Sequence, residues 1–189
     1  MQTITQNLFI MKNQTLPIDF DKINLTEFFG CVNATNTKQM KSNAFKTLRT
    51  WLQEKSFAKW SDEQVEYVGD FMDGADFIDQ NGIFYEMKGK LKMFNKNGST
   101  SVVDLKNFRG ETKVVEKTFE YMLLVDTSSM TIGFTDWETV NQRLYFSPTS
   151  PVAKFKLFPG DYEILSENVI PTMKNITSSE ILDNLLCIL

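Results

Sequence analysis

The sequence predicts an α/β fold in which a central mixed β-sheet is flanked by helices. Three observations support this fold class. Helical periodicity dominates the chain before residue 73, a hairpin pattern occupies residues 76–90, and apolar strand patterns recur at 119–126 and 130–137. The long connection between the hairpin and the strand at 119–126 permits a crossover, which would place two strands parallel in one sheet.

Helices are expected in the first part of the chain. Residues 21–31 can form a short helix, and residues 37–57 carry an apolar stripe at helical spacing, made of Met40, Ala44, Phe45, Leu48, Trp51 and Leu52. Ser61-Asp62-Glu63-Gln64 has the spacing of a capping box. It predicts a helix that ends at Met72, because Gly74 then interrupts the helical pattern.

The hairpin follows directly after Gly74. Residues 76–79 alternate, Gln80-Asn81-Gly82 marks a turn, and residues 83–90 alternate again. A three-residue loop with Gly82 in the left-handed conformation would pair Asp76 with Glu86. Opposed residues share one face of a sheet, and Lys88, two residues further, joins them. A two-residue loop would instead place the two carboxylates on opposite faces, so the prediction depends on register.

The remaining elements complete the expected sheet. Residues 101–117 are predicted to be helical in part, with an interruption at Gly110, and to form the crossover that leads to the strands at 119–126 and 130–137. Residues 141–189 are punctuated by proline and glycine, with a short alternating segment at 153–158. Ser178-Ser179-Glu180 is expected to cap a last helix, whose apolar side either closes the core or forms a dimer contact; packing on its own domain is preferred.

Composition excludes several classes of protein. With 189 residues and 42% hydrophobic residues, the chain is long and apolar enough for one domain with a full core. No apolar run is long enough to span a membrane, and the N-terminus lacks a secretory signal, so a cytoplasmic location is expected. The two cysteines are too few for a disulfide framework or a zinc site.

The chain contains no histidine. This excludes Ser-His-Asp and Cys-His catalysis, histidine-ligated zinc hydrolases and histidine-based ribonucleases. An enzyme built from this sequence must work through carboxylates, lysines or tyrosines, with or without a metal.

The residues Asp76, Glu86 and Lys88 fit one kind of chemistry. Two carboxylates on neighbouring strands form a hard-oxygen site suited to Mg²⁺ or Mn²⁺. Such an ion lowers the pKa of a bound water and neutralises charge on a phosphoryl group, and a nearby lysine can orient the water or stabilise the transition state. The alternative is a solvated charge cluster on an exposed hairpin. The apolar surroundings favour the metal site, because unpaired acids among apolar residues cost free energy.

An aspartate that opens one strand, followed by Glu-x-Lys on the next, resembles the signature of the PD-(D/E)xK nucleases, the restriction-endonuclease-like superfamily. The matching residues are Asp76 and Glu86-Met87-Lys88. Ala75 stands where the signature has proline, a common departure in the family. The resemblance covers about residues 60–140, and its specific part is the hairpin alone.

The resemblance implies a restriction-endonuclease-like α/β sandwich. It implies one nuclease domain over residues 1–189, with a common core at about 60–140, an N-terminal helical part at 1–60 and a C-terminal extension at 141–189. Within that fold, Asp76 and Glu86 would bind Mg²⁺, which Mn²⁺ can replace, and the backbone carbonyl of Met87 would add a ligand. Lys88 would activate water or stabilise the transition state. A glutamate on the preceding helix sometimes adds a ligand in this family, which makes Glu63 and Glu66 candidates.

Charge is segregated along the chain, although its net value is only −4. Residues 37–60 hold six Lys/Arg against one acid, and residues 86–117 hold eight against four, while residues 61–85 hold seven acids and no base. A nuclease needs this combination of cations for phosphates and anions for a metal. The candidate nucleic-acid contacts are Lys41, Arg49, Lys90, Lys92 and Lys96. The alternative for the strand lysines is protection of a sheet edge.

These inferences lead to a Mg²⁺-dependent DNA endonuclease of the type II restriction class, acting on double-stranded DNA as a homodimer with no membrane association. A repair, junction-resolving or mobile-element nuclease of the same fold is one alternative, and RNA as the substrate is another. A third is a non-catalytic binding or regulatory protein, which the acidic total charge also suits.

Overall fold

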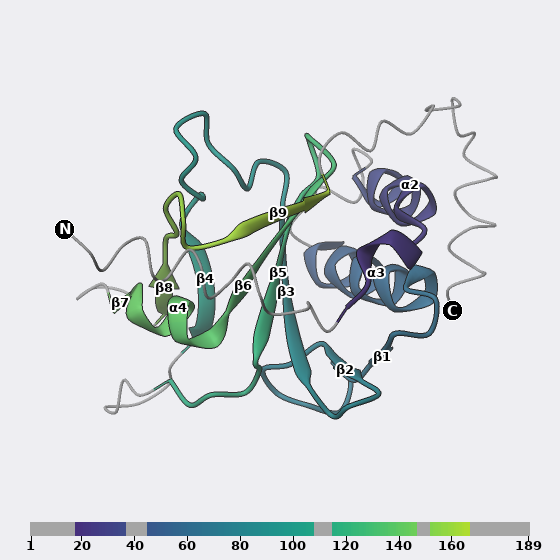
Figure 1. Ribbon diagram of the computed structural model, residues 1–189, viewed down its shortest axis with the longest axis horizontal. Coiled ribbons are helices and arrows are strands. Elements are labelled where there is room, and N and C mark those ends of the chain that lie inside the picture. Colours follow the sequence, from purple (N-terminus) through teal and green to yellow (C-terminus); the bar gives the residue numbers. More distant parts are fainter. Residues whose placement is uncertain (1–17, 37–44, 108–114, 147–151, 167–189) are drawn as a thin grey trace.

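The computed structural model describes residues 18–36, 45–107, 115–146 and 152–166 (Figure 1). Its helical elements are η1 (Phe20–Lys22), α2 (Leu25–Thr35), α3 (Lys46–Trp60) and α4 (Trp137–Gln142). Its strands are β1 (Val65–Tyr67), β2 (Phe77–Asp79), β3 (Phe84–Lys90), β4 (Val103–Asn107), β5 (Tyr121–Asp126), β6 (Thr131–Asp136), β7 (Leu144–Phe146), β8 (Val152–Phe155) and β9 (Glu163–Ser166). No helix in these ranges is long and apolar enough to cross a membrane.

The strands form two sheets. The larger has six strands in the order β1-β2-β3-β5-β6-β9, and the smaller has the order β4-β8-β7. In the large sheet β3 and β5 are parallel, and every other neighbouring pair is antiparallel. The predicted α/β class with a central mixed sheet is therefore confirmed, as is the parallel arrangement of β3 and β5.

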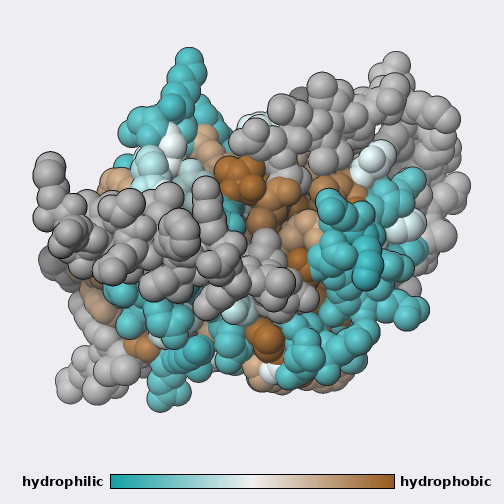
Figure 2. Space-filling model, in the orientation of Figure 1, coloured by the Kyte–Doolittle hydropathy of each residue, from teal (hydrophilic) through white to brown (hydrophobic). Residues whose placement is uncertain are grey.

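The large sheet lies between two layers. Figure 1 shows α2 and α3 on one side of it and the small sheet with α4 on the other. Leu123 and Val125 of β5 pack in the core on the helical side, while Met122 and Leu124 pack in the core beside the small sheet. This alternation at period two explains why the β5 sequence is apolar throughout. On the face shown in Figure 2, described apolar residues gather in the central band and hydrophilic ones cover the sides.

The predicted helix between residues 61 and 72 is wrong. Ser61 ends helix α3 instead of starting a new helix, and its hydroxyl donates to the Ala58 carbonyl (2.7 Å). Asp62 and Glu63 both have positive φ angles, of 56° and 59°, which no right-handed helix allows. Strand β1 follows and pairs antiparallel with β2, so tertiary pairing overrides the local helical pattern.

The predicted helix at 101–117 is also wrong for its described residues, 101–107 and 115–117. Residues 103–107 form strand β4, which pairs with β8, about fifty residues later in the chain. The interruption expected at Gly110 lies outside the described residues, as do part of the segment at 37–57 and the helix expected from Ser178. The strands expected at 119–126 and 130–137 are confirmed as β5 and β6.

Asp126, at the end of β5, holds two loops together. One carboxylate oxygen accepts hydrogen bonds from the backbone N–H groups of Met93 (2.7 Å) and Phe94 (3.0 Å). The other accepts from the N–H groups of Ser128 and Ser129 (both 3.0 Å) and from the Ser128 hydroxyl (2.8 Å). Burial opposes ionisation, but these donors lower the pKa of Asp126 below its usual value.

Asp126→Ala is expected to lower the free energy of unfolding by about 3 kcal/mol, because it leaves the buried Met93 N–H and several partly buried donors without an acceptor. Urea unfolding followed by circular dichroism measures the change. Asp104→Ala is the matched control, since Asp104 is exposed and its ion pair with Lys154 is long (3.9 Å); it should change stability by less than about 0.5 kcal/mol. Equal effects of the two substitutions would contradict the structural role of Asp126.

A candidate metal site at the edge of strand β3

The β2–β3 hairpin has the register that the turn sequence predicts. Phe77 pairs with Tyr85 and Ile78 with Phe84, and the N–H of Asp79 donates to the Ile83 carbonyl (3.0 Å). Gly82 has a φ of +79°, the left-handed conformation required to close a three-residue loop. The alternative two-residue loop is thereby excluded. Asp76 and Glu86 are the next residues outward from the last of these pairs, Phe77 with Tyr85.

Asp76 lies where β2 begins and β3 becomes the edge of the sheet. Its N–H donates to the Tyr85 carbonyl (2.8 Å), and its carboxylate accepts from the N–H of Met87 (2.7 Å). The carboxylate thus accepts the hydrogen bond that a backbone carbonyl of a paired strand would otherwise accept. N–H and C=O of one strand residue point to the same side. The Met87 carbonyl therefore faces the same edge as the Asp76 carboxylate.

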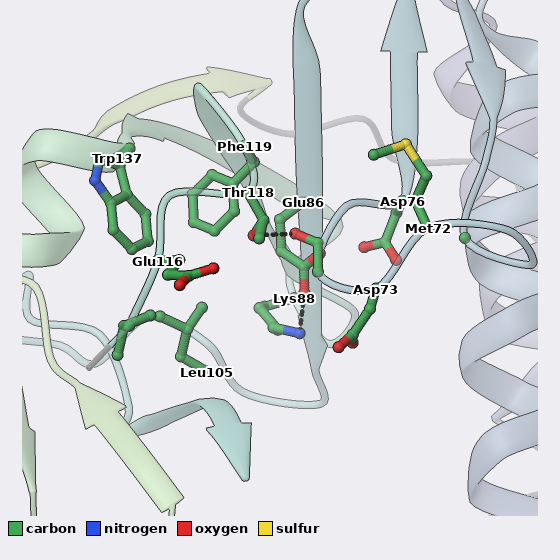
Figure 3. Close-up of a pocket in the computed structure, with 13 residues that line it drawn as sticks. Met72, Asp73, Asp76, Glu86, Lys88, Leu105, Glu116, Thr118, Phe119 and Trp137 are labelled. Atoms are coloured by element: carbon green, nitrogen blue, oxygen red, sulfur yellow. Dashed lines mark hydrogen bonds and ion pairs between the residues drawn. The ribbon is translucent and has the colours of Figure 1, made fainter. Parts of the chain in front are cut away.

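Glu86 and Lys88 complete the trio (Figure 3). Glu86 is buried, and the Lys88 ammonium forms an ion pair with its carboxylate. Burial alone would lower the pKa of Lys88, but the charges of Glu86, Asp76 and Glu54 raise it, so the lysine is held in its charged form. Burial, the charge of Glu86 and a hydrogen bond with that carboxyl raise the pKa of Asp76 to about 7, despite the Met87 N–H. The two carboxyl groups are therefore immediate neighbours.

Helix α3 contributes a further acid that the sequence analysis missed. Glu54 is buried, and burial together with the charges of Asp76 and Glu86 raises its pKa to about 8. It is the only acid in the basic segment 37–60, and that isolation was the available signal. Its separation from the hairpin in sequence hides this electrostatic interaction, because only the tertiary fold brings α3 near the two carboxylates.

The trio opens into a pocket of about 270 Å³. Asp76, Glu86 and Lys88 line its wall, and Figure 3 shows their polar ends directed toward one space. Asp73, from the loop before β2, and Glu116 also line the pocket. Its apolar side is formed by Leu105, Val115, Phe119 and Trp137. The pocket is lined by several acids and by the Lys88 ammonium, so it can accommodate a metal cation and a phosphate together.

The donor set fits Mg²⁺ or Mn²⁺ better than a softer metal. Among the described residues, no group of three or more histidine, cysteine or acidic side chains is placed so that it could hold a metal ion by itself. Mg²⁺ does not require one, because it is usually held by one or two carboxylates, waters and a substrate phosphate. Asp76, Glu86 and the Met87 carbonyl provide oxygen ligands only. They would hold such an ion, with Glu54 close enough to influence it.

The other predicted site residues are distributed differently. Glu63 lies in the turn before β1 and Glu66 on β1; both are exposed, neither lines the pocket, and their expected placement on a helix is wrong. Arg49, Lys90 and Lys92 line a second hollow beside Lys88.

The two remaining predicted contacts are Lys96 and Lys41. Lys96 lines a separate depression with Phe94 and Tyr162. Lys92, in the second hollow, lies just after the end of β3. Lys41 lies outside the described residues.

Comparisons with known proteins add no identity. A scan against protein-family models finds no matching family, and a search of curated proteins finds no match. The arrangement of Asp76, Glu86, Lys88 and Glu54 at the edge of β3 is therefore the basis on which the function is inferred.

Proposed function

We propose that this protein is a Mg²⁺-dependent endonuclease that hydrolyses phosphodiester bonds in double-stranded DNA. One observation carries the proposal. Asp76 and Glu86, from neighbouring strands, share one pocket with Lys88, which is ion-paired to Glu86. A PD-(D/E)xK nuclease needs these three groups together, and the register that unites them depends on a single turn.

The residues divide the chemical work in a definite way. Asp76, Glu86 and the Met87 carbonyl would hold the cation, and Mn²⁺ can replace Mg²⁺ there. When bound, the ion would polarise the phosphoryl group and lower the pKa of a water. Lys88 stays charged beside Glu86 and offers its ammonium to the attacking water or to the charge that develops on phosphorus. Phe119 and Trp137 form an apolar wall of the same pocket.

The order of elements supports a restriction-endonuclease-like fold. Helix α3 precedes the meander β1-β2-β3, and β5 lies parallel to β3. One feature departs from the expected core, because the connection from β3 to β5 contains strand β4 where a helix was expected. We propose the family on the site and on the β1-β2-β3-β5 order.

Within this family we propose the type II restriction class, because the described residues contain one such site. A homodimer with two-fold symmetry would match a palindromic duplex and place one site on each strand. We propose that it acts in the cytoplasm. Digestion of a mixed-sequence plasmid separates this class from its relatives. Discrete bands support a restriction enzyme, a smear supports nonspecific cleavage, and selective cutting of branched DNA supports a resolvase.

Lys88→Ala is expected to reduce Mg²⁺-dependent cleavage of supercoiled and linear DNA by ~10²–10³-fold, because one fixed positive charge is lost where the transition state becomes more negative. Gel assays with Mg²⁺ or EDTA measure the rate. Lys117→Ala is the matched control: Lys117 pairs with Glu138 at the surface and lies outside the pocket lining, so its loss should leave the rate unchanged. Full cleavage by the Lys88 variant would remove this lysine from the mechanism.

A further inference from the structure

A second hollow lies beside the candidate metal site, between helix α3 and strand β3. We call it the Arg49 groove; it has a volume of about 600 Å³. Its charged lining residues are Lys46, Arg49, Lys88, Lys90, Lys92 and Asp104. Lys88 also lines the metal pocket, so the two hollows share a wall.

The groove is strongly positive. Five cations line it against Asp104 alone, and that aspartate is paired with Lys154. Within the part of the chain that the structure describes, no ion pair is found for Lys46, Arg49 or Lys92. Arg49 is only partly exposed. Bringing these charges together costs free energy, which an anionic ligand would offset.

The backbone of β3 is accessible at the floor of the groove. Gly89 is exposed, and a Cβ atom at this position would lie 3.0 Å from the Gln53 side-chain oxygen of α3. The carbonyls of Phe84 and Lys90 accept from N–H groups on the β5 side, whereas the Met87 N–H points to Asp76. Gly89, two residues after Met87, therefore directs its N–H to the open edge. Glycine in a strand often marks a close approach, and here the approaching group is the Gln53 side chain of α3.

We infer that the Arg49 groove binds the phosphates next to the scissile phosphate on the same nucleic-acid strand. The inference rests on the proposed function for the scissile phosphate itself, and it fixes the path of the strand across the protein. From the carboxylates of Asp76 and Glu86, the strand passes Lys88 and enters the groove over Gly89. Arg49 and Lys92 contact its phosphates through charge, independently of base sequence.

Fluorescence anisotropy with a labelled 30-base-pair duplex tests this inference. The full-length protein is titrated in EDTA at several salt concentrations, so binding is measured without cleavage. Arg49→Ala is expected to weaken binding about tenfold and to reduce the slope of log affinity against log salt by ~0.9, the value for one duplex phosphate contact. Lys46→Ala combined with Lys92→Ala should reduce the slope by about two such contacts.

Two controls accompany these variants. Lys59→Ala removes one positive charge from the same helix outside the groove lining and should leave the slope unchanged. Arg49→Lys keeps the charge and should retain most of the binding. Unchanged affinity and slope in Arg49→Ala and in the double variant would overturn the inference, as would a wild-type protein that does not bind the duplex at low salt.

Cleavage with Mg²⁺ is scored separately from binding. If the protein binds DNA through Arg49 but does not cut it, the inference about the Arg49 groove stands and the proposed nuclease function is wrong. If the protein cuts DNA and the groove variants bind DNA as tightly as the wild type, the proposed nuclease function stands and the inference about the Arg49 groove is wrong.

Discussion

Glu86→Gln is expected to reduce Mg²⁺-dependent DNA cleavage by ~10³-fold or more, because it replaces one of two ligand carboxylates with a neutral amide. The substitution is nearly isosteric, and glutamine can still accept a hydrogen bond from Lys88. Loss of activity would therefore report the missing charge and not a disrupted hairpin. Asp76→Asn is expected to act in the same way, since the amide oxygen can still accept from the Met87 N–H.

Metal binding provides a readout independent of cleavage. Calorimetric titration with Mn²⁺ should show one site in the wild type and no measurable binding in either variant. Glu63→Gln and Glu66→Gln are matched controls, because both side chains are exposed and outside the pocket. A Glu86 variant that cuts DNA at the wild-type rate, or that binds Mn²⁺ unchanged, would contradict the proposed site. A wild type that binds Mn²⁺ without cleaving DNA would favour a non-catalytic role.

The sequence could predict the part of the site that lies within the β2–β3 hairpin. The hairpin register follows from three turn residues and from the alternation on either side of Gly82, all within about a dozen residues. Sequence-local information of this kind decides which carboxylates share a face. Asp76, Glu86 and Lys88 were accessible to prediction for that reason.

The role of Glu54 could not be predicted from the sequence, for the opposite reason. It reaches the site through packing of α3 against the sheet, across the turn that precedes β1. The helix glutamate was predicted on the element directly before the hairpin, at Glu63 or Glu66. The element directly before the hairpin is strand β1. The helix that contributes an acid is therefore α3, which precedes β1, and the acid is Glu54.

The two incorrect helices share a physical cause. Val65, Val68, Phe71 and Met72 have helical spacing, but β1 finds backbone partners in β2 and the chain turns at Asp62 and Glu63. Strand β4 finds its partner in β8, which the local sequence around residue 105 cannot indicate. Backbone pairing with another strand therefore decided both segments against their local helical patterns, with the nearby strand β2 for β1 and the distant strand β8 for β4.

Crowding of the site acids leads to an unusual expected dependence of stability on pH. The folded-state pKa of Asp76 is raised to about 7 and that of Glu54 to about 8, chiefly by burial and by neighbouring carboxylates. Their unfolded-state pKa values are about 4. The folded protein therefore binds more protons than the unfolded chain between about pH 4 and pH 8. Stability from these groups is complete below pH 4 and is lost as pH rises through 7 and 8.

In EDTA, the free energy of unfolding is expected to fall on the order of 4 kcal/mol between pH 5 and pH 8.5, as measured by urea unfolding. Saturating Mn²⁺ should restore stability most strongly at the higher pH, because a divalent cation favours the ionised carboxylates. Glu54→Gln should raise stability at pH 8.5 without metal and flatten the pH profile, whereas Glu66→Gln, an exposed control, should not. A metal-free protein equally stable at both pH values would show that these acids do not share one buried site. Stability that falls with rising pH and is restored by Mn²⁺ is expected of a carboxylate cluster that binds a cation. Acids with a purely structural role would not give the response to Mn²⁺.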